Sequence, residues 1–120
     1  MKVFSSLMLL VALAMALGCG TQNCPPQVLA VEPATGSANH TSIAPGNQLQ
    51  FTAKWTITGN DQGCYYMQAM PSVTWTTSDA VNTTISATGL ATCVNATSQP
   101  ATITATEVNG QKATATLTCQ

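Results

Sequence analysis

The sequence contains very little charge and no arginine at all. Lys2, Lys54 and Lys112 are its three cations, four residues are acidic, and the formal net charge is -1. A nucleic-acid partner requires a basic face that displaces counterions, so no nucleic-acid binding is expected. Disordered chains are highly charged and poor in hydrophobic residues, whereas this chain is 6% charged and 45% hydrophobic. At 120 residues, we therefore expect one folded domain.

Residue sets that carry catalysis or hold metal ions are also missing. His40 is the single histidine and no two cysteines form a CxxC pair, so the spacing of a tetrahedral zinc site is absent. No serine stands in a GxSxG motif. The carboxylates Glu32, Asp61, Asp79 and Glu107 are far apart in the sequence, whereas general acid–base catalysis uses paired groups. We expect no enzyme activity, no catalytic residue, no metal site and no cofactor.

The only long hydrophobic run lies at the N-terminus. Lys2 precedes an apolar stretch, 3–17, that only Ser5 and Ser6 interrupt. The stretch is shorter than a comfortable membrane span and ends in small residues, which is typical of an export signal. We predict a signal peptide over residues 1–18.

The end of this segment, MALGC at 15–19, resembles a bacterial lipoprotein signal, in which the cysteine after the cut becomes the lipid-carrying N-terminus. The family favours leucine three places before the cysteine, whereas here Leu17 is two places before Cys19. The resemblance implies lipidation of Cys19, attachment to a membrane through this anchor, and a lipidated tether over 19–27 whose two prolines stiffen it. The alternative is an ordinary secretory signal cut near Gly18 or Gly20.

The number of cysteines supports the lipoprotein interpretation. The chain has five, and an odd thiol in an exported protein needs an explanation. Acylation of Cys19 leaves an even set. In an exported chain such a set forms two disulfides by default. The disulfide candidates are Cys24, Cys64, Cys93 and Cys119.

Alternation with period two dominates the rest of the chain, and nothing argues for a helix. Apolar and polar residues alternate most clearly over 49–57, which predicts one core face and one wet face. Asn109-Gly110 separates two further runs and is a hairpin signal, because both residues tolerate a positive φ. About seven short strands indicate an all-β sandwich. The strands are expected within 28–32, 49–57, 72–79, 83–89, 90–98, 101–108 and 112–118.

Two segments are predicted as loops. Turn residues fill 34–47, where Ile43 is the one large apolar side chain. Glycine, asparagine and aspartate interrupt the alternation over 58–71. This second loop carries several large, amphipathic residues of the kind that often make contacts with other molecules. Apolar loop residues beside a cysteine are also commonly packed against the protein by the disulfide. Both interpretations stay open for Tyr65, Tyr66, Met67 and Met70.

Four stretches resemble the bacterial immunoglobulin-like family, group 2. They are QLQFTA, VTWTTSD, TISATGLAT and PATITATEVNGQKATATLT, and they occur in the family's order over most of 28–118. The resemblance implies an immunoglobulin-like sandwich of two antiparallel sheets over residues 28–120. Family members serve as spacers, stalks or adhesive surfaces and have no catalytic residue to carry over. The implied core is Phe51, Trp75, Ile85, Leu90, Ile103 and Leu117.

The cysteines and the loop 58–71 depart from the family pattern. In a sandwich of this topology the start of the first strand lies near the end of the second, which implies a Cys24–Cys64 bridge. Cys93 and Cys119 then meet between the sheets. A Cys64–Cys93 bridge remains an alternative, because the loop is long enough to reach.

These features together predict an exported domain, lipid-anchored in the bacterial cell envelope, that acts in adhesion or protein interaction. Its partner is then a protein or carbohydrate ligand. The alternative is a structural component in which exposed strand edges join copies of the chain to one another.

Overall fold

The computed structural model describes residues 24–59, 63–66 and 69–120. Within these ranges the chain forms nine β-strands and no helix. The predicted signal peptide, Cys19 and Met67 lie outside the described residues. The strands are β1 (Gln27–Glu32), β2 (Thr35–Ala38), β3 (Gln48–Gln50), β4 (Thr52–Ile57), β5 (Val73–Thr77), β6 (Thr83–Ile85), β7 (Leu90–Cys93), β8 (Ala101–Glu107) and β9 (Lys112–Cys119).

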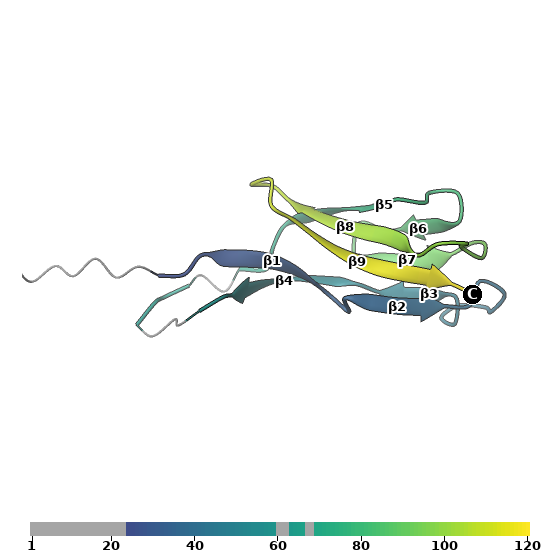
Figure 1. Cartoon of the computed structure of the whole chain (residues 1–120), viewed down its shortest axis with the longest axis horizontal. Helices are drawn as coiled ribbons and strands as arrows, with labels where there is room; N and C mark the ends of the chain where they lie inside the picture. The colour runs from purple at the N-terminus through teal and green to yellow at the C-terminus, as the bar shows by residue number, and fades with distance from the viewer. Residues whose placement is uncertain (1–23, 60–62, 67–68) are drawn as a thin grey trace, which may run out of the picture.

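The strands form two layers that pack face to face (Figure 1). One layer is a sheet of order β2-β9-β8-β5, and the other consists of β3-β7-β6 together with the pair β1-β4. The pairs are antiparallel except for β2 and β9, which run parallel. The expected all-β, immunoglobulin-like sandwich is confirmed, with nine strands where about seven were expected from the turn spacing.

The strand predicted over 49–57 changes its partner at Phe51. Before this residue β3 pairs with β7, and after it β4 pairs with β1. At the change the Phe51 amide donates to the Gly89 carbonyl, with an N···O distance of 2.8 Å. The alternation is unaffected, because Phe51 and Ala53 are buried while Thr52 is exposed. One run of sequence therefore contributes two strands to the count.

β2 lies in the segment 34–47, where the sequence predicts turns, so this part of the prediction is wrong. Its four residues, TGSA, show no apolar alternation. Their extended conformation depends on β9, with Thr35 opposite Thr116, a partner that lies far along the chain. A Cβ atom at Gly36 would lie 2.2 Å from Leu49 Cδ2, so β2 and β3 approach closely at this glycine.

The β8–β9 hairpin forms across Asn109-Gly110, but with a different turn from the expected one. Gly110 has φ 93°, whereas no described residue other than glycine has a positive φ, so the expectation for Asn109 is wrong. Gly110 N donates to Glu107 O at 2.9 Å and Glu107 N donates to Gln111 O at 2.8 Å. The loop thus has three residues, with glycine alone in the left-handed position.

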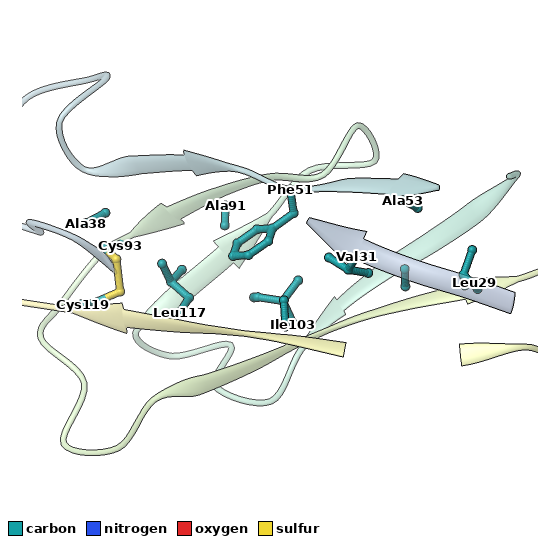
Figure 2. Close-up of a cluster of buried hydrophobic side chains, with 12 residues drawn as sticks. Leu29, Val31, Ala38, Phe51, Ala53, Ala91, Cys93, Ile103, Leu117 and Cys119 are labelled. Carbon is teal, nitrogen blue, oxygen red and sulfur yellow. A yellow bond between two sulfur atoms is a disulfide. The ribbon is translucent and has the colours of Figure 1, made fainter. Parts of the chain in front are cut away.

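The core lies between the two layers, and Figure 2 shows Phe51 reaching from one layer toward the side chains of the other. Phe51, Ile103 and Leu117 are completely buried, as the resemblance implied. Trp75 and Ile85 are half-buried and pack against the edge of this cluster. The core is therefore continuous across the sandwich.

Leu90 is not part of the core, and the expectation for it is wrong. The burial of β7 alternates so that Ala91 and Cys93 point inward while Leu90 is half-buried on the other face. Leu90 and Ala91 are both apolar, so polarity alone does not show which of the two points into the core. The inward direction of Cys93, which is bridged to the opposite layer, sets the register of β7.

Replacing Gly89 by alanine is expected to destabilise the domain more than the same change at Gly110, although φ is positive at both, 85° and 93°. A Cβ atom at Gly89 would lie 2.4 Å from the Phe51 carbonyl oxygen, whereas at Gly110 it would meet nothing within 4 Å. Gly110→Ala therefore costs only the left-handed backbone, about 1–2 kcal/mol. Gly89→Ala must also move the chain away from Phe51. Urea unfolding compares the two variants, and equal losses would contradict the close approach at Gly89.

Candidate functional site

Two of the carboxylates make local structural contacts. Glu32 on β1 forms an exposed ion pair with Lys54 on β4. The Glu107 carboxylate accepts the backbone amide of Asn109 in the hairpin, at 2.6 Å. Asp61 lies outside the described residues. These interactions stabilise strand ends and turns and bring no two acids together.

Asp79 belongs to the turn between β5 and β6. It accepts the Asn82 side-chain amide at 2.8 Å and the Asn82 backbone amide at 3.1 Å. These two hydrogen bonds hold the pKa of Asp79 below its ordinary value. The Asp79 carbonyl accepts the hydroxyl of the buried Thr83 at 2.6 Å. The Asp79 carboxylate and the Thr83 hydroxyl therefore fix the geometry of the turn between the two strands.

The part of the chain that the structure describes contains no group of three His, Cys, Asp or Glu residues able to hold a metal ion. Across the same residues there is also no helix of the length and hydropathy needed to cross a bilayer.

Two disulfides connect the four described cysteines, and they differ in their surroundings. Cys24–Cys64 joins the residues before β1 to the loop after β4, with a Cα–Cα distance of 5.7 Å, and Cys24 is exposed. Cys93–Cys119 joins β7 in one layer to β9 in the other, at 5.5 Å, and its cysteines are 1% and 2% exposed (Figure 2). This is the pairing that the sandwich topology implied, and the alternative Cys64–Cys93 bridge is not formed.

The buried disulfide organises one end of the sandwich. The loops 39–47, 78–82 and 94–100, here called the distal tip, lie together with the C-terminus at the end opposite residue 24 (Figure 1). Cys93 N donates to the Asn47 carbonyl at 2.8 Å, and Thr97 N donates to the Cys119 carbonyl at 3.0 Å. Two of the three loops are thus held directly on the cysteine backbone.

Three large apolar side chains of the distal tip are exposed to solvent. Ile43 is 88% exposed, and Val81 and Val94 are also exposed. Val81 and Val94 lie on adjacent loops, because the Val94 amide donates to the Asn82 carbonyl at 2.8 Å. Loops that are held by hydrogen bonds and present apolar side chains to solvent are suited to contacts with another molecule.

The loop after β4 lies at the other end of the sandwich, here called the N-terminal end, together with residues 24–26 and the β8–β9 hairpin (Figure 1). The Tyr66 hydroxyl donates to the Pro25 carbonyl at 2.6 Å and the ring is half-buried. Tyr65 is fully exposed and Met70 is 74% exposed. The two open interpretations of this loop therefore apply to different residues: Tyr66 packs, while Tyr65 and Met70 are available for contact.

Two shallow hollows flank Met70 and Pro71. The larger, about 330 Å³, lies between β4 and β5, and its walls contain no ionisable side chain. The smaller, about 220 Å³, lies beside Trp55 and Tyr66 and contains one lysine, Lys54. Neither hollow has the converging polar groups that are typical of an enzyme pocket.

Residues 30–117 match the model of a known protein family, the bacterial Ig-like domain (group 2). The chain belongs to this family. No curated protein matches the chain. Domains of this group are typical of bacterial surface proteins, and the two disulfides also indicate an extracytoplasmic location.

The distal tip of this bacterial Ig-like domain was not identified as a candidate surface from the sequence. Ile43 stands out as the one large apolar residue among turn residues, which is the signal that points to it. Val81 and Val94 carry no comparable signal, because Val81 follows the strand predicted over 72–79 and Val94 lies within the one predicted over 90–98. Their exposure becomes clear only when the turns on either side of β6 and β7 are placed.

Proposed function

We propose that this chain is an exported, lipid-anchored domain of the cell envelope that acts as an adhesion or protein-interaction module through its distal tip. The observation that carries the proposal is the position of the exposed apolar side chains Ile43, Val81 and Val94. Their loops lie at the end of the sandwich opposite residue 24, the first described residue (Figure 1).

The anchor part of the proposal rests on Cys19. This residue is five positions before Cys24, and five residues span at most about 18 Å. Each methylene of an attached acyl chain adds about 0.8 kcal/mol when buried, so two or three chains on Cys19 hold a protein stably. The sandwich then stands close to the membrane and presents the distal tip outward.

The interaction part is tested by variants on opposite ends of the sandwich. Ile43→Ser/Val81→Ser removes two exposed apolar side chains from the distal tip, and Val108→Ser removes an equally exposed one from the β8–β9 hairpin. Binding is measured by surface plasmon resonance on immobilised mucin, collagen and peptidoglycan fragments. The tip variant is expected to lose affinity on the order of tenfold for whichever surface the unchanged domain binds, and Val108→Ser is expected to keep it. Equal affinity of the tip variant would contradict the proposal.

A second candidate function is self-assembly through strand edges. β5 is the last strand of its sheet, so one of its edges has no β-strand partner among the described residues. Its sequence, VTWTT, contains no lysine or proline to prevent pairing with another chain. Sedimentation velocity of the concentrated, delipidated domain separates the two candidates. Discrete monomers would count against assembly, and a concentration-dependent series of larger species would support it.

A further inference from the structure

The N-terminal end of the sandwich has its own exposed apolar side chains. Tyr65, Met70 and Val108 are all largely accessible to solvent. The Val108 amide donates to the Ser72 carbonyl at 3.3 Å, so the hairpin and the loop after β4 are in contact. Ser72 is two residues after Met70, whereas Tyr65 lies farther back in the same loop, beside Cys64. The three side chains are thus at the same end of the molecule without being in direct contact, and together they are called here the basal patch.

The basal patch is tied covalently to the start of the described chain. Tyr65 directly follows Cys64, and the Cys24–Cys64 bridge holds the two cysteine Cα atoms 5.7 Å apart. Cys19 precedes Cys24 by five residues, a span of at most about 18 Å. If Cys19 carries lipid, Tyr65 cannot lie far from the bilayer surface.

The chemistry of the basal patch suits the boundary between headgroups and acyl chains. Tyrosine is enriched at this boundary, because its ring is apolar and its hydroxyl remains hydrated. Methionine and valine are apolar and carry no charge that would have to be desolvated. Lys112, exposed at the start of β9 beside the hairpin, adds a positive charge that attracts anionic headgroups.

We propose that the basal patch is a second, non-covalent membrane contact, in which Tyr65, Met70 and Val108 rest in the lipid interface beside the anchor. This inference rests on the lipid anchor of the proposed function. The occupant is a lipid surface rather than a protein, because the short chain between Cys19 and Cys24 leaves little room for another macromolecule at this end. The contact orients the sandwich with its distal tip away from the membrane.

Depth-dependent quenching tests the proposal on the full lipidated chain. The chain is reconstituted in vesicles of phosphatidylcholine and phosphatidylglycerol whose acyl chains carry bromine. Tyr65→Trp and Ile43→Trp each place one additional indole at an exposed position, on the basal patch and on the distal tip respectively. The unsubstituted chain supplies the common background of Trp55 and Trp75. The indole at position 65 is expected to be quenched several-fold more strongly than the one at position 43. Equal quenching would overturn the proposal.

A second measurement uses serine variants that keep both disulfides. Tyr65→Ser/Met70→Ser removes the apolar contact, and Ile43→Ser/Val81→Ser is the matched control on the distal tip. Transfer of the lipidated chain from donor to acceptor vesicles is expected to be several-fold faster for the first variant and unchanged for the second. Equal transfer rates would overturn the proposal.

The intact mass of the same samples separates the failure of this inference from the failure of the proposed function. Acyl chains on Cys19 together with equal quenching at both positions would reject the basal contact alone. A chain without acyl groups would reject the anchor, and the basal contact with it.

Discussion

The double variant Cys93→Ala/Cys119→Ala is expected to lose about 3.5 kcal/mol of unfolding free energy from loop closure alone, for a sequence separation of 26 residues. The variant also removes two buried sulfur atoms from the core, where the lost packing adds about 1–2 kcal/mol. Small domains have a total stability of about 5–15 kcal/mol. Thermal unfolding under non-reducing conditions should therefore have a midpoint lower by roughly 15 °C or more.

Cys24→Ala/Cys64→Ala is the matched control for this prediction. Its sequence separation is 40 residues, so the loop-closure contribution is slightly larger, about 3.9 kcal/mol. Cys24 is exposed, however, and its removal leaves no cavity in the core. The control should consequently lose less in total than the buried pair. An equal or greater loss in the control would show that packing around Cys93–Cys119 contributes little.

Phe51→Ala is expected to cost about 3–5 kcal/mol, the usual range for a fully buried phenylalanine. Phe51 has no exposed surface and reaches across the core at the position where its strand changes partner (Figure 2). The loss therefore includes contacts with both layers of the sandwich. Urea unfolding with both disulfides intact measures it.

Thr52→Ala controls for the Phe51 variant. Thr52 is the next residue along the chain and is exposed on the opposite face, so its replacement should change stability by about 0.5 kcal/mol or less. A loss below about 1 kcal/mol for Phe51→Ala would contradict the assignment of Phe51 as the centre of the core.

Local alternation was sufficient to predict the strands that have one buried and one wet face. In β8 every second residue is buried from Ala101 to Glu107, and the threonines between them favour the extended backbone. The hairpin after β8 was also predicted, because its turn residues are local. These elements depend on interactions between near neighbours in the sequence.

Elements that depend on distant partners were not predicted. β2 has no pattern of its own and exists because β9 lies beside it. The change of partner at Phe51 depends on β1 and β7, which come before and well after it in the sequence. Leu90 was assigned to the core by the family resemblance, but the register of β7 is set by Cys93. Periodicity contains no information on these pairings.

The candidate surfaces show the same limit. Cysteine parity and export predicted the disulfide set, whereas the choice among pairings required the topology of the sandwich. The loop with Tyr65 and Tyr66 was identified by composition, but composition did not indicate that it lies at the N-terminal end (Figure 1). This position follows from the antiparallel pairing of β1 with β4, which puts the end of β4 beside the start of β1. The loop is therefore a candidate membrane contact in addition to a candidate contact for another molecule.

Intact mass spectrometry of the chain extracted from membranes, after thiol alkylation without reductant, tests the central claim most directly. The account predicts a polypeptide that begins at Cys19, carries acyl groups, and has no alkylated thiol, because the other four cysteines are bridged. A chain that begins elsewhere without acyl groups, or that takes up alkylating reagent, would contradict it.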